Sequence, residues 1–406
     1  MAAAVRVLKQ RGFAALIAQG TDMNLKPHFS RFLGAVPDRL LFTAHSHHPW
    51  PNVSYDAHMQ AWDDAARLAD LKWDKVFGEV IPKARTQVAH ILKLPDSRTL
   101  CFAPSVHELL MRLLSTFEQK PLRVLTTDGE FHSFGRQMKR LEESGAAQVT
   151  RVQIEPCDLF ESRFADAIAR GGYDFLYFSQ VFYNSGLRVQ NLDALVARVP
   201  DTDSVIFIDG YHGYMAVPTD LSKIAARVFY AAGGYKYAMC GEGACFMHCP
   251  PGYAARPLNT GWFSMFGGLT KSQASARTPY PDDGQRFMGS TYDPTGLYRL
   301  NAVMDWMQRE KFTVAQIHQH AQEMQALFFD LVTRHGLLKD AELIPPLNNP
   351  RGNFLIFRHP AAAEWRQRLL ELNVVTDCRD DRLRIGFGVY HDPADIVALA
   401  ARLAEL

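Results

Sequence analysis

The sequence predicts an α/β protein with a large domain, built on a mainly parallel mixed sheet, and a small α+β domain. Three observations support this prediction. The chain has 406 residues, which is too long for one simple core. Hydrophobic residues make up 47% and charged residues 21%, an ordinary globular composition. From about Thr99 to Cys249, short apolar runs alternate with longer amphipathic stretches. Beyond about Tyr298 this alternation gives way to two long helical patterns.

The alternating region has the pattern of strands joined by crossover helices. Apolar residues recur at three- and four-residue spacing between the apolar runs, which predicts helices there. Strands that alternate with helices form mainly parallel sheets covered on both faces. The predicted strands are Thr99–Ala103, Leu122–Thr127, Val149–Ile154, Asp174–Ser179, Val205–Asp209, Arg227–Ala231 and Gly243–His248, and the predicted helices are Ser105–Gln119, Phe131–Ser144 and Leu159–Arg170.

The C-terminal region predicts the small domain. Its helical patterns are Thr295–Arg309, Val314–His335 and Ala361–Asn373, and its apolar runs are Asn353–Arg358, Val374–Cys378 and Leu383–Phe387. We expect the N-terminal residues to fold with it, because open α/β enzymes often wrap both termini together. The predicted domains are therefore 46–297, and 1–45 plus 298–406.

Charge and hydropathy exclude several classes of function. Lys and Arg total 44 against 43 for Asp and Glu, a net charge of +1, so bulk charge does not favour nucleic-acid binding. No stretch approaches the ~18 uninterrupted apolar residues of a membrane helix. Met1 to Gly20 lacks the apolar core and cleavage site of a signal peptide, and we interpret it as an amphipathic helix of a cytoplasmic protein.

The six cysteines are too sparse for a disulfide scaffold. One group, Cys240, Cys245, His248 and Cys249, offers soft ligands for a metal or an iron–sulfur cluster. Its spacing matches no common zinc or cluster pattern, and reduced cysteine also packs as a small hydrophobe on buried strands. We therefore predict no metal site.

Two polar residues stand at the ends of apolar strands, where open parallel sheets bind their ligands. Asp209 ends the run Val205–Asp209, and Lys236 follows a glycine turn one strand–connection–strand unit later. Desolvation of a lysine in an apolar turn favours the neutral amine, which can form a Schiff base. An acid that pairs with a pyridinium nitrogen is the other half of pyridoxal 5'-phosphate (PLP) chemistry. Each residue alone would more often be a turn residue or a solvated side chain.

The whole chain resembles the fold-type I, class V PLP-dependent enzymes, and among these it is most similar to the kynureninases. The resemblance rests on seven segments that follow the order and spacing of that family. They are Asp209-Gly210-Tyr211-His212, Tyr235-Lys236-Tyr237, Gly261-Trp262-Phe263, Arg351-Gly352, Phe357-Arg358-His359-Pro360, Val374-Val375-Thr376-Asp377-Cys378-Arg379 and Leu383-Arg384-Ile385-Gly386.

The resemblance assigns roles around the cofactor ring. Lys236 would hold PLP covalently, and Asp209 would hydrogen-bond the pyridine nitrogen. His212 would lie near the phenolate or the phosphate, and Tyr235 would touch the phosphate. Phe131 matches the position whose ring stacks on the cofactor, and His132 would take that place if the alignment slipped by one residue.

The resemblance also predicts a phosphate cup and a homodimer with shared sites. Ser105 and Val106 open a helix, whose N-terminal amides favour a dianion. Ser105-Val106-His107-Glu108 also reads as a capping box, which needs no ligand. Trp262 joins the cofactor-binding set. Ser290, beside Thr291, matches a segment that reaches the phosphate from the other subunit.

On the substrate side, Arg384 is expected to grip an α-carboxylate through two parallel hydrogen bonds. Kynureninases carry an Asn-Ser-Leu-Gly-type segment near the N-terminus, but here the stretch reads Phe42-Thr43-Ala44-His45-Ser46-His47-His48-Pro49-Trp50. His45 and Ser46 are predicted to line the substrate pocket, although a plain loop would also explain them. Phe182 stands where the family tends to place a polar residue beside the ring.

The resemblance implies a kynureninase-like hydrolase or lyase. It would cleave the Cβ–Cγ bond of kynurenine or an analogue and release alanine through a Schiff base of Lys236, with Tyr235 or Tyr237 as proton donor. Transamination by the same residues is an alternative, and cysteine desulfuration through Cys378 is a weaker one. A non-catalytic PLP-dependent regulator is disfavoured because no basic helix-turn-helix segment is present. A nicotinamide dehydrogenase is disfavoured because no Gly-x-Gly-x-x-Gly follows the first strand.

Overall fold

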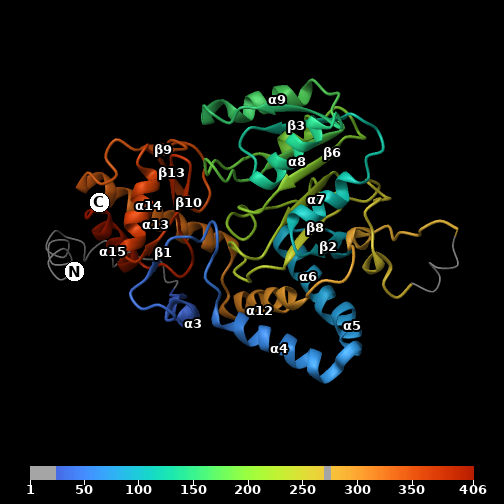
Figure 1. Ribbon diagram of the computed structural model, residues 1–406, viewed down its shortest axis with the longest axis horizontal. Coiled ribbons are helices and arrows are strands. Elements are labelled where there is room, and N and C mark those ends of the chain that lie inside the picture. Colours follow the sequence, from blue (N-terminus) through green and yellow to red (C-terminus); the bar gives the residue numbers. More distant parts are fainter. Residues whose placement is uncertain (1–23, 269–275) are drawn as a thin grey trace.

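The computed structural model describes residues 24–268 and 276–406. The predicted N-terminal helix lies outside the described residues. Figure 1 shows two groups of elements side by side: a large sheet with its helices, and a smaller group that contains the C-terminus. No helix in the described part of the chain combines the length and the apolar character that crossing a membrane requires.

The large sheet has seven strands in the order β2-β8-β7-β6-β5-β3-β4. β8 pairs antiparallel with both of its neighbours, and the other pairs are parallel, so the sheet is mixed and mainly parallel. This confirms the predicted fold class. The strands are β2 (Leu100–Ala103), β3 (Leu122–Thr127), β4 (Ala147–Val152), β5 (Phe175–Ser179), β6 (Val205–Asp209), β7 (Val228–Ala232) and β8 (Cys245–His248).

Burial explains why these strands read as continuous apolar runs. Every residue of β5, β6, β7 and β8 is buried, because both faces of these central strands are covered. The helices of this part are α4 (Asn52–Leu68), α5 (Lys72–Lys75), α6 (Ile81–Leu92), α7 (Val106–Leu114), α8 (His132–Glu143), α9 (Phe160–Ala169) and α10 (Leu192–Ala197).

The smaller group is built on a four-stranded antiparallel sheet in the order β12-β13-β10-β9. Its strands are β9 (Glu342–Ile344), β10 (Phe354–Arg358), β12 (Asp377–Arg379) and β13 (Arg382–Gly386), and its helices are α13 (Val314–His335), α14 (Ala362–Glu371) and α15 (Pro393–Leu403). Local signals fix the helix ends. Thr313 and Gln316 form a capping box on α13, and Gly336 ends that helix with a φ of 61°.

The predicted run Val374–Cys378 is two strands rather than one. β11 (Val374–Val375) pairs in parallel with β1 (Leu40–Leu41), whereas β12 pairs with β13. The described N-terminal residues, which include α3 (Ser30–Leu33), therefore meet the C-terminal part of the chain. Position 298 falls inside α12 (Thr295–Glu310), which packs along α4 and α6, and the domain boundaries stay a prediction.

Candidate active site

The predicted catalytic pair lies at the carboxyl edge of the large sheet. Ser179, Asp209 and Ala231 are in register at the ends of the parallel strands β5, β6 and β7. Beyond β7, a glycine turn brings Lys236 back over this edge. The turn is tight, because a Cβ on Gly234 would lie 2.4 Å from the Cys240 Sγ and 2.5 Å from the Gly241 carbonyl oxygen.

Lys236 is buried, with 5% of its surface exposed. Its Nζ lies 2.8 Å from the His212 Nε2 and 4.7 Å from the centre of the Tyr211 ring. Burial lowers the pKa of Lys236 to about 7, although the negative charge of Asp209 opposes the shift. A large share of the amine is therefore neutral at neutral pH, as the apolar turn predicts.

Asp209 is held in place by two donors. The Tyr177 hydroxyl donates to its Oδ2 at 2.7 Å, and the Tyr211 backbone N–H donates to its Oδ1 at 2.9 Å. Burial raises the pKa of Asp209, and both hydrogen bonds oppose that shift. The carboxylate is thus fixed in orientation and remains able to accept a further bond.

A second buried acid, Glu130, lies behind this site. The Thr127 and Ser179 hydroxyls donate to it, both at 2.6 Å. Burial raises the pKa of Glu130 to about 8, and the charge of Asp209 adds to the shift. Glu130 is therefore mostly protonated at neutral pH.

The cavity enclosed by these residues has a volume of about 290 Å³. It is lined by Pro104, Ser105, Val106, His107, Leu110, Phe131, Ser133, Phe134, Tyr177, Ser179, Tyr183, Asp209, Tyr211, His212, Tyr235, Lys236, Glu242, Gly243 and Cys245. Seven predicted cofactor residues are thus brought together: Ser105, Val106, Phe131, Asp209, His212, Tyr235 and Lys236. The structure favours Phe131 over His132, because only Phe131 lines the cavity.

The N-terminus of α7 faces this cavity. The Ser105 side chain accepts a hydrogen bond from the Glu108 backbone N–H at 3.2 Å. Only this half of the predicted capping box forms, since the Glu108 carboxylate pairs with Arg112 at 2.8 Å instead. The first turn of α7 therefore keeps amides free to bind an anion.

Two predicted cofactor residues lie elsewhere. Trp262 donates through Nε1 to the Thr291 hydroxyl at 2.8 Å, and Ser290 is exposed. Neither lines the cavity of its own chain. For Ser290 this placement is compatible with the expectation that it serves the other subunit.

Arg384, the predicted carboxylate ligand, is 3% exposed. Its Nη1 donates to the Tyr183 carbonyl oxygen at 2.8 Å, and its Nη2 donates to Asp377. Its Nε is buried and has no hydrogen-bond partner. His45 is fully buried beside this pair, with Nε2 3.8 Å from the Asp377 Oδ2 and both ring nitrogens unpartnered.

The structure places the other substrate-side residues, Ser46, His47 and Phe182, in different surroundings. The Ser46 hydroxyl donates to the Thr43 carbonyl oxygen at 3.1 Å, within a local turn. His47 stacks on Tyr235, with ring centres 4.9 Å apart. The placement of Phe182 beside the cofactor ring is wrong: Phe182 is fully buried against Phe160, because it points into the core rather than toward the sheet edge.

The cysteine group does not converge on one point. His248 is bonded to the Thr99 hydroxyl and the Ala225 carbonyl oxygen, both at 2.7 Å. Cys249 lies beside Cys101, whereas Cys245 lies at the Lys236 cavity with its Sγ 3.4 Å from the Tyr211 hydroxyl. Across residues 24–268 and 276–406, no three His, Cys, Asp or Glu side chains are placed to hold a metal ion together.

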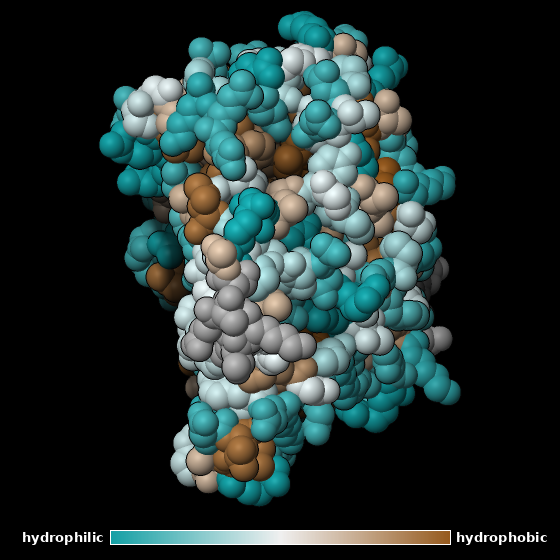
Figure 2. All heavy atoms as spheres, turned by 90° about the vertical axis from the view of Figure 1, so that its right-hand side faces the viewer, coloured by the Kyte–Doolittle hydropathy of each residue, from teal (hydrophilic) through white to brown (hydrophobic). Residues whose placement is uncertain are grey.

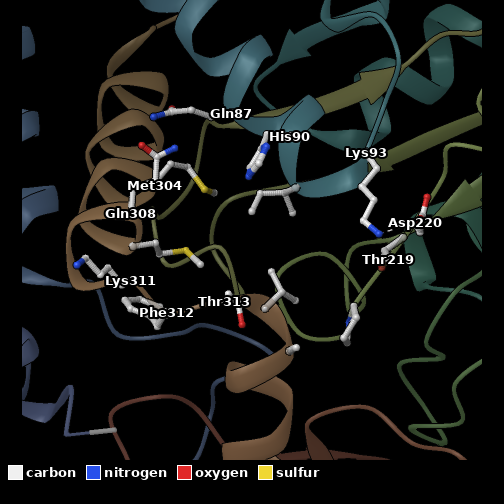
Figure 3. Close-up of a pocket in the computed structure, with 15 residues that line it drawn as sticks. Gln87, His90, Lys93, Thr219, Asp220, Met304, Gln308, Lys311, Phe312 and Thr313 are labelled. Carbon is white, nitrogen blue, oxygen red and sulfur yellow. Dashed lines mark hydrogen bonds and ion pairs between the residues drawn. The ribbon is translucent and has the colours of Figure 1, made fainter.

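A larger cavity of about 570 Å³ lies between α6, the end of α12 and the start of α13 (Figure 3). Its wall includes Met304 and Phe312, and the Lys93 amine there is already paired with Asp220 at 2.8 Å. It contains none of the strand-end residues. The smaller cavity is therefore the better candidate active site, because the buried amine and carboxylates gather there.

Sequence reasoning missed Glu130, Tyr177, Tyr211 and Cys245 as site residues. Tyr177 precedes Ser179 by two residues on β5, so strand periodicity carried a signal for it. Tyr211 lies in the turn after β6, and its signal was its place in the segment Asp209-Gly210-Tyr211-His212. Cys245 gave none, because it reaches the site only through the antiparallel direction of β8, which brings the first residue of that strand to the carboxyl edge.

The side chains present fit PLP. Lys236 supplies a desolvated amine, Asp209 an oriented acceptor for a ring nitrogen, Phe131 an aromatic face, and the first turn of α7 a site for a phosphate. A Cβ on Gly233 would lie 2.3 Å from the Tyr211 hydroxyl and 2.5 Å from the Cys245 Sγ, so glycine preserves the shape of the turn here.

Comparison with known proteins agrees with this chemistry. The family model "Aminotransferase class-V" matches residues 63–343, and "Kynureninase C-terminal domain" matches residues 317–403. The kynureninase of Pseudomonas fluorescens is 27% identical over 217 residues, which are 52% of this chain and 50% of the relative. The kynureninase of Deinococcus radiodurans is 25% identical over 261 residues, 63% of this chain and 61% of the relative. The chain thus matches only half to three-fifths of the length of these curated relatives.

Solved structures share the fold. The cystine C-S lyase C-DES, in complex with its reaction product cysteine persulfide, has a TM-score of 0.78 at 17% identity, over 92% of this chain and 99% of that one. A C-DES mutant with glycine covalently linked to the PLP cofactor has a TM-score of 0.76 at 16% identity, over 93% and 99%. With the match over 63–343, the chain belongs to the class V aminotransferase family, and its cofactor is pyridoxal 5'-phosphate.

Proposed function

We propose that this protein is a kynureninase-like hydrolase that cleaves the Cβ–Cγ bond of kynurenine or an analogue and releases alanine. The observation that carries the proposal is the meeting of Lys236 and Asp209 at the edge of the large sheet, with Arg384 of β13 close enough for its charge to lower the pKa of Lys236. The C-terminal part of the chain also matches the kynureninase domain. The two kynureninase relatives support the same choice.

PLP, when bound, supplies the electron sink that stabilises a carbanion at the substrate Cα. Around it, Phe131 would contact the ring face, Asp209 would accept from the ring nitrogen, and the α7 N-terminus would bind the phosphate. His212 and Tyr235 would complete the contacts.

Lys236 has the properties of the general base. Because its pKa is about 7, the amine is partly neutral at neutral pH and can take a proton from the substrate Cα. The His212 Nε2, 2.8 Å away, is placed to orient that amine.

Tyr235 is the better of the two proposed proton donors. It lines the cavity, and burial raises its pKa to about 12, so it keeps its proton at neutral pH. The Tyr237 hydroxyl instead donates to the Asn353 carbonyl oxygen at 2.8 Å and does not line the cavity.

Arg384 would bind the substrate carboxylate, with its unpartnered Nε as the free donor. His45, whose ring nitrogens are also unpartnered, would lie beside that carboxylate. Ser46 is retained as a weaker substrate-side candidate, because its hydroxyl is used within its own turn.

We further propose a homodimer in which Ser290 and Trp262 of each chain serve the site of the other. The absence of both residues from the cavity lining of their own chain supports this arrangement. Figure 2 shows apolar surface at the lower tip of the molecule, where the corner between α4 and α5 lies. Leu71 at this corner and Trp62 within α4 are each 66% exposed. Exposed apolar side chains of this size favour burial against a second subunit.

Desulfuration has less support than cleavage. Cys378 lies on β12, outside the cavity, and its Sγ donates to the Asp380 carbonyl oxygen. Burial raises the pKa of this thiol. Cys245 does line the cavity, but burial raises its pKa to about 11, so it is not a thiolate at neutral pH.

The test is an absorption spectrum of the purified protein before and after adding kynurenine and 3-hydroxykynurenine, with mapping of the borohydride-reduced peptide. A PLP band that reduces onto Lys236, with anthranilate-type fluorescence on turnover, is the expected result. PLP bound to Lys236 without turnover of either compound would refute the kynurenine assignment, and release of a keto acid would favour transamination.

A further inference from the structure

A second groove, of about 470 Å³, lies between α13 and the segment that leads into β10. Phe329, Leu347 and Leu355 form apolar parts of its wall, and Gln325, Asp330 and Arg351 form polar parts. None of these residues lines the Lys236 cavity. The groove is therefore separate from the proposed active site.

Arg351 is a buried cation without a counter-charge. It is 8% exposed, and its Nη2 donates to the Pro346 carbonyl oxygen at 2.8 Å. No carboxylate in the described part of the chain pairs with it, and burial alone lowers its pKa. A buried guanidinium without an anion is costly, so an anionic ligand would stabilise this arrangement.

Two acceptors in the same groove lack donors. Gln325 is 4% exposed; its Nε2 donates to the Gly352 carbonyl oxygen at 3.0 Å, but its Oε1 has no partner. The Asp330 Oδ1 accepts from the Arg334 Nε at 2.7 Å, whereas its buried Oδ2 has no partner. Both oxygens lack an N–H or O–H donor, and both residues line the groove.

The groove also has an apolar side. Leu347 is 57% exposed, and Phe329 and Leu355 lie along the same wall. An apolar group of a ligand would remove this surface from water. A ligand that matches this groove therefore carries an anionic group, a cationic N–H donor and an apolar group within one small molecule.

We propose that this groove binds a free α-amino acid with an apolar side chain. Its carboxylate would contact Arg351, its ammonium group the Gln325 and Asp330 oxygens, and its side chain Leu347 and Phe329. This is a second amino-acid site, and it does not depend on the proposed function.

The groove is connected to the lysine turn. Arg351 and Gly352 lead directly to Asn353, whose carbonyl oxygen accepts from the Tyr237 hydroxyl at 2.8 Å. Tyr237 follows Lys236 in the chain. This chain of contacts joins the Arg351 groove to the turn that carries Lys236.

The test is a calorimetric titration of the PLP-loaded protein with L-phenylalanine after borohydride reduction, which fixes the cofactor on Lys236 so that the amino acid cannot displace it. We expect saturable binding that Arg351→Met weakens at least tenfold and Asp330→Asn weakens severalfold. Arg309→Met, a matched change at an exposed arginine of α12, should leave the affinity unchanged, and so should Arg384→Gln.

Three results would overturn the proposal. The first is the absence of saturable binding, and the second is an equal affinity of the wild type and Arg351→Met. The third is a loss of binding in Arg384→Gln while Arg351→Met still binds, which would place the ligand in the Lys236 cavity. N-acetyl-L-phenylalanine amide, which carries neither charge, should not bind, and equal binding would also count against it. If Arg351→Met fails to fold, Asp330→Asn decides alone, and an unchanged affinity refutes the site.

Discussion

Replacing Lys236 by methionine should stabilise the cofactor-free protein, and by more at pH 7 than at pH 9. Burial lowers the folded-state pKa of this lysine from 10.5 to about 7. Between pH 7 and pH 10.5 the unfolded chain binds a proton on this lysine that the folded chain has released, so the contribution of Lys236 to the free energy of unfolding rises with pH. At 1.36 kcal/mol per pKa unit, the cost of burying Lys236 is on the order of 4 kcal/mol at pH 7 and roughly 2 kcal/mol at pH 9.

Methionine removes the titrating group but also the contact with the His212 Nε2, which we value at about 1 kcal/mol. The expected net gain is roughly 3 kcal/mol at pH 7 and roughly 1 kcal/mol at pH 9. Urea unfolding of the cofactor-free wild type and Lys236→Met at both pH values measures it. Lys223→Met is the matched control, because the Lys223 side chain is 80% exposed, and its effect should not change between the two pH values. An equal gain at pH 7 and pH 9 for Lys236→Met would refute the argument from desolvation.

Three further predictions concern the same site. Arg384→Gln should raise the KM for the amino-acid substrate by about tenfold or more and change kcat less, because it removes charge-assisted bonds to the carboxylate. Arg379→Gln, on the exposed side of Asp377, should change KM little, and equal effects of the two variants would contradict the assignment. Between pH 4.5 and 8 the folded chain keeps a proton on Glu130, with a pKa of about 8, that the unfolded chain releases, so this group should lower the stability of the wild type by up to roughly 4 kcal/mol as the pH rises. Glu130→Gln should abolish this contribution in urea unfolding, and a fall of wild-type size in the variant would be the contrary result. Tyr237→Phe should lower the free energy of unfolding by about 1 kcal/mol and keep most of the activity, whereas Tyr235→Phe should lose activity at nearly unchanged stability. Steady-state rates and urea unfolding of both variants distinguish the two hydroxyls, and the reverse pattern would exclude Tyr235 as the proton donor.

Hydropathy along the chain was enough to locate the strands of the large sheet, most clearly the buried parallel strands β5, β6 and β7, because such strands are continuous apolar runs of limited length. It was not enough for helices whose buried side is not apolar. α4 fully buries only Ser54 and Asp64, and the apolar residues on its packed face, such as Val53, Ala57 and Ala61, are small or half-buried. Hydropathy therefore marks this helix weakly, and its position depends on packing along α12. The strand β1 is similar, since two residues acquire strand geometry only through their pairing with β11.

The sequence by itself determined which residues end strands, and hence that Asp209 and Lys236 stand at the sheet edge where a ligand binds. Strand order and direction were decided by the tertiary structure. The antiparallel β8 brings Cys245 to the Lys236 cavity, and the neighbouring strands bring Glu130 and Tyr177 behind Asp209. The physical reason is that periodicity specifies which face of an element is buried, whereas the partners of a buried polar group, and with them its pKa, depend on residues far away in the chain.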